Sequence, residues 1–130
     1  MAKATLAARL ILGLIFTVFG LNGFFSFLGQ PELTPEGGAL IGALVGSGYL
    51  LSVVKLVEVV AGLMLLSGFF VPLALLFLIP ITLNIFLFHA ILEPAGLPMG
   101  LVVLALNLFL GFVGYRGSFS GVLRARPDPE

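Results

Sequence analysis

The sequence predicts an all-α integral membrane protein, a four-helix bundle with its N- and C-termini in the cytoplasm. Of the 130 residues, 60% are hydrophobic and 9% are charged, and the mean hydropathy is +1.25. Soluble domains carry roughly 25% charged residues, so lipid rather than water is expected to cover most of this surface. The uncharged runs divide into four stretches close to the about 20 residues that cross a hydrocarbon core of about 30 Å. The whole chain is interpreted as one transmembrane domain.

The first span is expected at residues 4–28. The uncharged run after Arg9 is long enough to cross a bilayer and is not followed by the small residues of a signal-peptide cleavage site. We therefore interpret it as a retained helix. The loop that follows, residues 29–36, contains two prolines and two glutamates, which end helices and favour water.

Residues 37–48 are apolar and rich in glycine, but they are too few to cross a membrane. Gly38, Gly42 and Gly46 form two overlapping GxxxG spacings, which place a flat side on a helix that another backbone can approach closely. This segment is predicted to form a short interfacial or re-entrant helix before the second span. Its three glycines are candidates for helix packing.

The second span is predicted at residues 49–67 and the third at 72–92. The uncharged run over residues 59–92 is too long for one span, and Gly68 and Pro72 interrupt it, which indicates a tight hairpin at residues 68–71. Pro80 lies inside the third span, where its missing amide donor is expected to kink the helix.

The fourth span is predicted at residues 99–115, and residues 116–130 are expected to form a poorly ordered cytoplasmic tail. Orientation follows from the basic residues, because lysine and arginine concentrate on the cytoplasmic side. Basic residues flank the first and last spans: Lys3, Arg9, Arg116, Arg124 and Arg126. The charged residues of the loops predicted on the opposite side are all acidic: Glu32, Glu36 and Glu93.

Composition excludes several classes of function. The six basic and six acidic residues give a formal net charge of zero, which provides no electrostatic footprint for nucleic acid. The chain contains no cysteine, so it lacks the ligands of iron–sulfur clusters and the nucleophile of thiolate catalysis. One histidine cannot supply two axial haem ligands. We expect no metal site, and the sequence requires no cofactor.

Two charged residues fall inside the second span. Lys55 and Glu58 are three residues apart, which places them on one helical face where they can pair. A charged side chain at membrane depth costs about 2.5–3.5 kcal/mol on insertion scales, so its presence needs a reason. Lys55 either pairs with Glu58 or extends its ammonium group to the interface. Glu58 is an ion-pair partner, a neutral protonated acid or a functional group.

Counting about 1.5 Å of rise per residue places the polar residues of all four spans at similar depths in the outer half of the bilayer. This predicts a polar pocket that opens outward, with six candidate residues: Asn22, Lys55, Glu58, Asn84, His89 and Asn107. The alternative for the three asparagines is hydrogen bonding between helices. The alternative for His89 is anchoring at the interface.

The residues also carry a resemblance to a known family. In the second and third spans the chain reads KLVE at 55–58, AGL at 61–63, LLSG at 65–68, VPLAL at 71–75, PI at 80–81, NIF at 84–86 and FH at 88–89, followed by PAGL at 94–97. The first span contributes Arg9, Leu10, Gly13, Leu14, Phe16, Gly20 and Leu21. This ordered set resembles the DoxX-like family of small four-helix membrane proteins. The resemblance implies a bacterial cytoplasmic (inner) membrane location and, through the namesake subunits of a thiosulfate-to-quinone oxidoreductase, an association with redox chemistry.

Three functions remain open at this point. The first is an accessory subunit without catalytic activity of its own, which supports a redox or stress-related membrane process by contacting a partner protein or a quinone-like lipid. The second is a quinone- or lipid-binding oxidoreductase subunit in which Glu58 and His89 handle protons and Asn84 and Asn107 orient the ligand. The third is a small transporter or channel, which requires a homo-oligomer formed through the glycines of residues 37–48.

Overall fold

The computed structural model describes residues 2–29 and 32–130, and within them every regular element is a helix. The α-helices are α1 (Ala2–Phe25), α2 (Pro35–Gly46), α3 (Leu50–Ser67), α4 (Val71–Ile91) and α5 (Leu97–Phe109). The shorter helical turns are the 3-10 turns η1 (Pro94–Gly96) and η3 (Arg116–Phe119) and the π-helical turn η2 (Leu110–Gly114).

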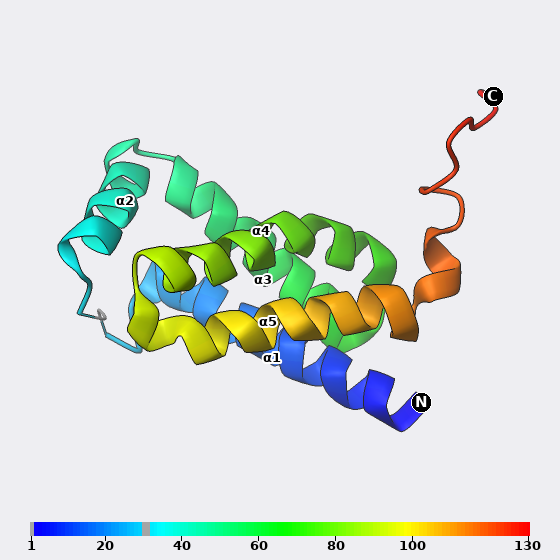
Figure 1. Ribbon diagram of the computed structural model, residues 1–130, viewed down its shortest axis with the longest axis horizontal. Helices are drawn as coiled ribbons and strands as arrows, with labels where there is room; N and C mark the ends of the chain where they lie inside the picture. The colour runs from blue at the N-terminus through cyan, green and yellow to red at the C-terminus, as the bar shows by residue number, and fades with distance from the viewer. Residues whose placement is uncertain (1, 30–31) are drawn as a thin grey trace.

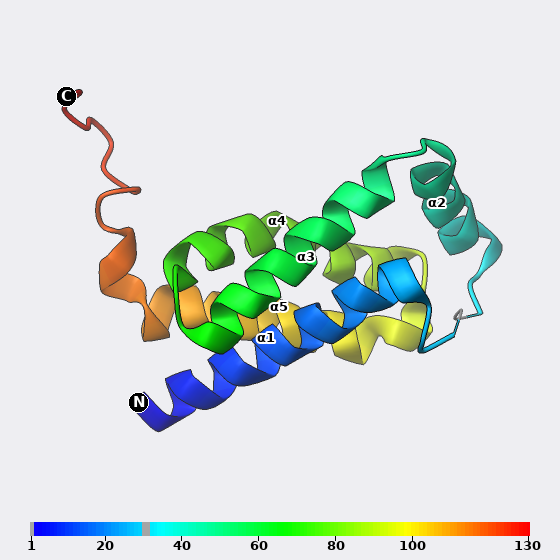
Figure 2. The same cartoon turned by 180° about the vertical axis from the view of Figure 1, so that it is seen from behind.

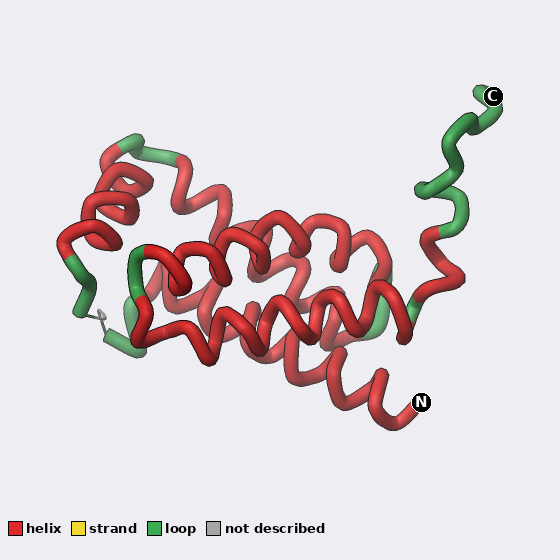
Figure 3. Tube along the Cα trace, in the orientation of Figure 1, coloured by secondary structure: helices red, strands yellow, loops and turns green. Residues whose placement is uncertain are grey.

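The four long helices α1, α3, α4 and α5 lie side by side as a bundle, and α2 lies outside it at one end (Figure 1). The most extensive pairings are α1 with α3 and α4 with α5, and the reverse view shows α1 along α3 (Figure 2). Loops join the helices at the ends of the bundle (Figure 3). Both termini lie at the end opposite α2 (Figure 1), as an even number of crossings requires.

Four helical segments are long and apolar enough to cross a membrane: Ala2–Phe25, Leu50–Ser67, Val71–Ile91 and Pro94–Gly114. Large apolar side chains are exposed on the outside of all four, among them Leu14, Leu56, Phe77 and Phe112. Such a surface is suited to lipid and not to water. The chain is a multi-pass membrane protein, and the prediction of a four-helix membrane bundle with a short helix before the second span is confirmed.

The first span ends at Phe25, three residues before the predicted end. Ser26 adopts the left-handed backbone conformation with φ +52°, and the side chain of Asn22 accepts a hydrogen bond of 2.8 Å from the Leu28 amide. The helix therefore stops where Asn22 begins a turn. Gln30 and Pro31 of the following loop lie outside the described residues.

The hairpin between α3 and α4 is as tight as its sequence predicts. Gly68 ends α3 with φ +81°, a conformation that glycine adopts at low cost, and Pro72 lies in the first turn of α4. α4 then continues through Pro80 without interruption. The last residues of the chain are exposed, but the tail begins with η3 because Phe119 packs into the core.

Glycine sets the distance between α1 and α3. A methyl group on Gly13 would lie 3.0 Å from the carbonyl oxygen of Gly62, and one on Gly62 would lie 2.7 Å from the Thr17 amide nitrogen. By contrast, a methyl group on Gly42 or Gly46 would meet nothing within 4 Å. Within this chain the close helix contact is therefore made by the glycines of α1 and α3. The glycines of α2 do not take part in it, because α2 lies beyond the end of the bundle. Contact between copies through α2 stays a prediction.

Candidate functional site

A cavity of about 720 Å³ lies within the bundle at the end that carries α2. Its walls come from all five α-helices and are mainly aliphatic and aromatic, and α2 contributes Leu40, Ile41 and Leu44. Four polar residues interrupt these walls: Lys55, Glu58, Asn84 and His89. Pockets for small molecules usually enclose about 300–1,000 Å³ with mostly apolar walls and a few polar groups, so this cavity has the size and lining of a binding site.

Lys55 and Glu58 form an ion pair on the wall that α3 contributes. The Lys55 Nζ lies 3.1 Å from the Glu58 Oε2, and the two side chains are 24% and 5% exposed. The pair fits beside α1 because a methyl group on Gly23 would lie 2.5 Å from the Lys55 Cγ, and one on Gly20 would lie 3.2 Å from the Glu58 Cβ. The two glycines of α1 therefore provide the room in which the ion pair is buried.

Asn84 lies one turn after Pro80 on α4, and its side-chain amide donates a hydrogen bond of 2.7 Å to the Pro80 carbonyl oxygen. This bond fixes the direction of the carboxamide. The carboxamide oxygen is a hydrogen-bond acceptor, and Asn84 is exposed on the cavity wall. It can therefore receive a donor from a molecule in the cavity.

His89 lies near the end of α4, and its ring packs against the start of α5. The Nδ1 atom lies 3.1 Å from the carbonyl oxygen of Glu93. Because a carbonyl oxygen can only accept, Nδ1 carries a proton, and in the neutral ring Nε2 is then an acceptor. A methyl group on Gly96 would overlap the imidazole, so η1 must have glycine there to allow this position.

Glu93 is the residue of this region that the sequence analysis missed. The sequence predicts it in the loop after the third span, and in the structure its side chain is 7% exposed. Its Oε1 accepts a hydrogen bond of 2.5 Å from the Thr34 amide, and a methyl group on Gly37 would overlap the carboxylate. The Thr34 hydroxyl donates to the Leu92 carbonyl oxygen at 2.7 Å and accepts from the Gly37 amide at 3.1 Å.

These bonds place a carboxylate at the N-terminus of α2, where the helix dipole favours negative charge and free amides need acceptors. They attach α2 to the end of α4 and so hold its apolar side chains over the cavity. The local signal was the N-cap Thr34 followed by Pro35 at the first helical position. That signal predicts where α2 begins, but not that Glu93, 59 residues further along the chain, would bind there.

Of the six residues proposed for the pocket, the other two lie outside the cavity lining. Asn22 is half-buried and binds the turn after α1. Asn107 is buried on α5, and its side-chain nitrogen has no hydrogen-bond partner in the part of the chain that the structure describes. The count of helical rise gives the height of each residue but not the direction of its side chain.

Comparison with protein families gives a match to the DoxX family model over residues 4–90. The chain belongs to the DoxX family. The matched region runs from α1 almost to the end of α4, so it contains Lys55, Glu58, Asn84 and His89 and stops before Glu93. Comparisons with curated proteins and with solved structures gave no match.

In this DoxX family member the cavity offers both hydrogen-bond donors and acceptors on otherwise apolar walls. An ammonium group has three donors, and only one is needed for the ion pair with Glu58. Within residues 2–29 and 32–130, no group of three or more His, Asp or Glu side chains could hold a metal ion. The arrangement suits an organic molecule with a small polar head and a long apolar body.

Proposed function

We propose that this DoxX family protein binds a quinone-like lipid in the cavity between its helices, as an accessory subunit of a redox or stress-related membrane process. The observation that carries the proposal is the cavity itself. It has about 720 Å³ of space, apolar walls, and an ion pair, an amide and an imidazole on those walls. A ligand that partitions into membranes and carries polar oxygens matches this lining.

Each polar residue of the cavity contacts the ligand in a different way. Lys55 donates a hydrogen bond to a carbonyl oxygen of the head group, and Glu58 holds the ammonium in place from the α3 side. His89 and Asn84 are placed on α4 to accept a donor or orient the ring. The apolar body of the ligand lies against side chains such as Ile81 and Val103.

The proposed role is accessory because the electrons must come from another protein. A quinone changes its redox state only with a donor or acceptor of electrons, and the chain has no cysteine to hold an iron–sulfur cluster or an exchangeable disulfide. In this proposal a partner membrane protein supplies that centre. The DoxX protein would hold the quinone beside the partner and shield its head group from water.

The proposal is tested by the small molecules that purify with the protein. Wild-type protein extracted into lipid nanodiscs should contain quinone enriched over the surrounding membrane lipid, as measured by mass spectrometry after solvent extraction. The Glu58→Gln variant should lose that enrichment while keeping its helical content. The exposed carboxylate of Glu36 provides the control, because Glu36→Gln leaves the cavity unchanged and should retain quinone.

If Glu58→Gln does not fold, a double variant provides a second test of quinone binding. The double variant Lys55→Met with Glu58→Leu removes both charges, and replacing a buried ion pair with apolar residues is often neutral or stabilising. It should fold and should lose the quinone. Wild-type enrichment that persists unchanged in the double variant would show that the polar residues do not recognise the ligand.

A further inference from the structure

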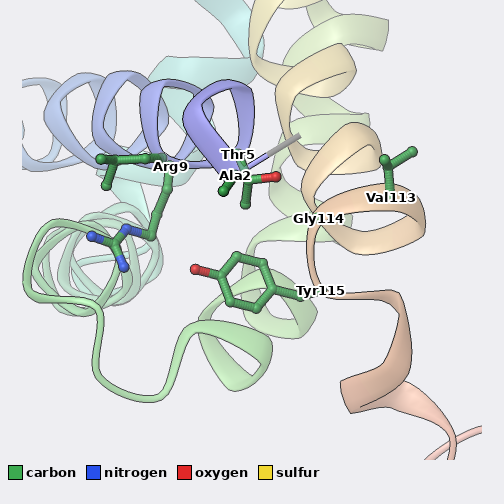
Figure 4. A pocket seen from close by; sticks show the side chains of 7 residues that line it. Ala2, Thr5, Arg9, Val113, Gly114 and Tyr115 are labelled. Carbon is green, nitrogen blue, oxygen red and sulfur yellow. The ribbon is translucent and has the colours of Figure 1, made fainter.

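A second cavity lies at the other end of the bundle, near both termini, and it shares no residue with the first. It encloses about 370 Å³ and is lined by Ala2, Thr5, Leu6, Arg9, Val113, Gly114 and Tyr115. Its walls therefore come from the start of α1 and from η2 with the residue after it (Figure 4). One charged side chain, Arg9, is part of this lining.

The guanidinium of Arg9 packs against the bundle. Its Nε is closed off from solvent and has no hydrogen-bond partner among the described residues. A methyl group on Gly68 would lie 2.6 Å from the Nη1 atom, so the group packs against the turn between α3 and α4. The ion pair found within residues 2–29 and 32–130 is that of Lys55 with Glu58, at the other end of the bundle. An unpaired guanidinium that is partly removed from water favours an anion beside it.

The π-helical turn places hydroxyl groups at the same cavity. The Tyr115 amide donates to the Leu110 carbonyl oxygen at 2.7 Å, the five-residue spacing of a π-helix, and this ends the helix with Tyr115 facing α1. Figure 4 shows the Tyr115 hydroxyl turned toward the Arg9 guanidinium. A methyl group on Gly114 would lie 3.2 Å from the Thr5 Oγ1, so the Thr5 hydroxyl lies against the same turn.

We propose that this cavity binds a phosphate group through Arg9, carried either by an anionic phospholipid or by a free phosphate ion. A planar guanidinium matches two phosphate oxygens at once, and hydroxyl groups donate to the remaining oxygens. Leu6 and Val113 are exposed apolar side chains in the same lining and suit an acyl chain. Basic pockets between transmembrane helices bind anionic head groups in this way.

The charges around the site agree with an anionic ligand. Lys3 and Arg116 are exposed on the elements that form the cavity, α1 and η3 beside η2. They lie outside the cavity lining, where water and salt screen their charges, so neither is expected to contribute measurably to binding at the cavity wall. Arg9 differs from them because its guanidinium is part of the cavity wall, so the two kinds of basic residue can be separated by experiment.

The test measures binding to the full-length protein after delipidation in an uncharged detergent, with native mass spectrometry. The probes are phosphatidylglycerol, inorganic phosphate and uncharged diacylglycerol. Phosphatidylglycerol should bind wild type and Arg116→Gln alike, and Arg9→Gln should weaken it by about tenfold, as expected for the loss of a charge-assisted hydrogen bond. Diacylglycerol should bind none of them at this site.

Inorganic phosphate decides the source of the group. Binding of phosphate with the same dependence on Arg9 shows that the site recognises the ion itself, whereas binding of the lipid alone shows that the acyl chains are needed. Equal affinity of phosphatidylglycerol for wild type and Arg9→Gln, or no preference over diacylglycerol, overturns the proposal. If Arg9→Gln fails to fold, Tyr115→Phe keeps the ring and should still weaken the lipid by a few fold.

Discussion

Lys55 and Glu58 differ in how far each can reach when the other is lost. Lys55 is a quarter exposed and has a long flexible stem, so its ammonium can move toward the head groups. Glu58 is 4% exposed and its side chain is shorter, so its carboxylate cannot reach the head groups. The cost of breaking the pair should therefore depend on which partner is removed.

We predict that Lys55→Met destabilises the protein by about 3 kcal/mol or more, the usual cost of stranding one member of a buried ion pair. Glu58→Gln should cost less, because the remaining lysine can find water. Thermal unfolding in nanodiscs measures both, and the exposed Lys3→Met serves as the control. Equal losses in the two variants would show that Lys55 is held as firmly as Glu58.

For single residues, the sequence predicts the depth of a polar side chain in the membrane but not the direction in which it points. The three-residue spacing of Lys55 and Glu58 was enough to place them on one face, because both lie on the same helix. Asn22 and Asn107 lie on helices whose rotation depends on packing against neighbours. Those contacts are made by residues far apart in the chain, so no local pattern encodes them.

Among the helices, the contact of α1 with α3 depends on glycine. We predict that Gly62→Ala destabilises the protein by about 1–3 kcal/mol, since the added methyl group would lie 2.5 Å from the Thr17 Oγ1 and overpack the contact. Gly42→Ala should be neutral or stabilising by up to about 1 kcal/mol, because it adds helix propensity where space is open. A loss of stability in Gly42→Ala would instead place α2 in a contact outside this chain.

The attachment of α2 gives a second prediction for the helices. Removing the carboxylate in Glu93→Ala deprives the N-terminus of α2 of its acceptor, worth about 1 kcal/mol. Hydrogen exchange of the amides in residues 35–46 should then be several fold faster, while exchange in α3 stays the same. Glu32→Ala, an exposed carboxylate in the preceding loop, should have no effect. Unchanged exchange in Glu93→Ala would mean that α2 is held by its apolar contacts alone.

The sequence predicts the spans themselves, because the length of an apolar segment that crosses a bilayer is set by the bilayer thickness and not by neighbouring helices. The start of α5 before Met99 was less clear, since Pro94 and Pro98 suggest a loop but occupy first-turn positions of η1 and α5. The position of α2 over the cavity was not readable. It depends on a hydrogen bond between Thr34 and Glu93, which no periodic pattern records.

For the whole molecule, the structure places both termini at one end, and the basic residues predict that this end faces the cytoplasm. The absence of cysteine allows a direct test with single introduced cysteines. In intact bacterial cells a membrane-impermeant maleimide should label Glu36→Cys in α2 but not Ser118→Cys in η3, both of which are exposed positions. Labelling of Ser118→Cys alone would show that the termini face outward. Labelling of both positions would contradict the predicted number of membrane crossings.

The two cavities give the molecule a different chemistry at each end. The one beside α2 is large, mostly apolar and closed on one side by a short helix. The one beside the termini is smaller and contains an arginine. Because their linings share no residue, loss of ligand from one is expected to leave the other unaffected.

Filling the larger cavity with a bulky side chain tests whether a quinone-like lipid binds there. Val54 lines the cavity, whereas its neighbour Val53 is 50% exposed on the outside of α3. Binding of a benzoquinone with a decyl tail, measured by isothermal titration calorimetry in detergent, should be abolished in Val54→Phe and unchanged in Val53→Phe. Equal binding in the two variants, or no binding to the wild-type protein, would show that this cavity does not bind a quinone.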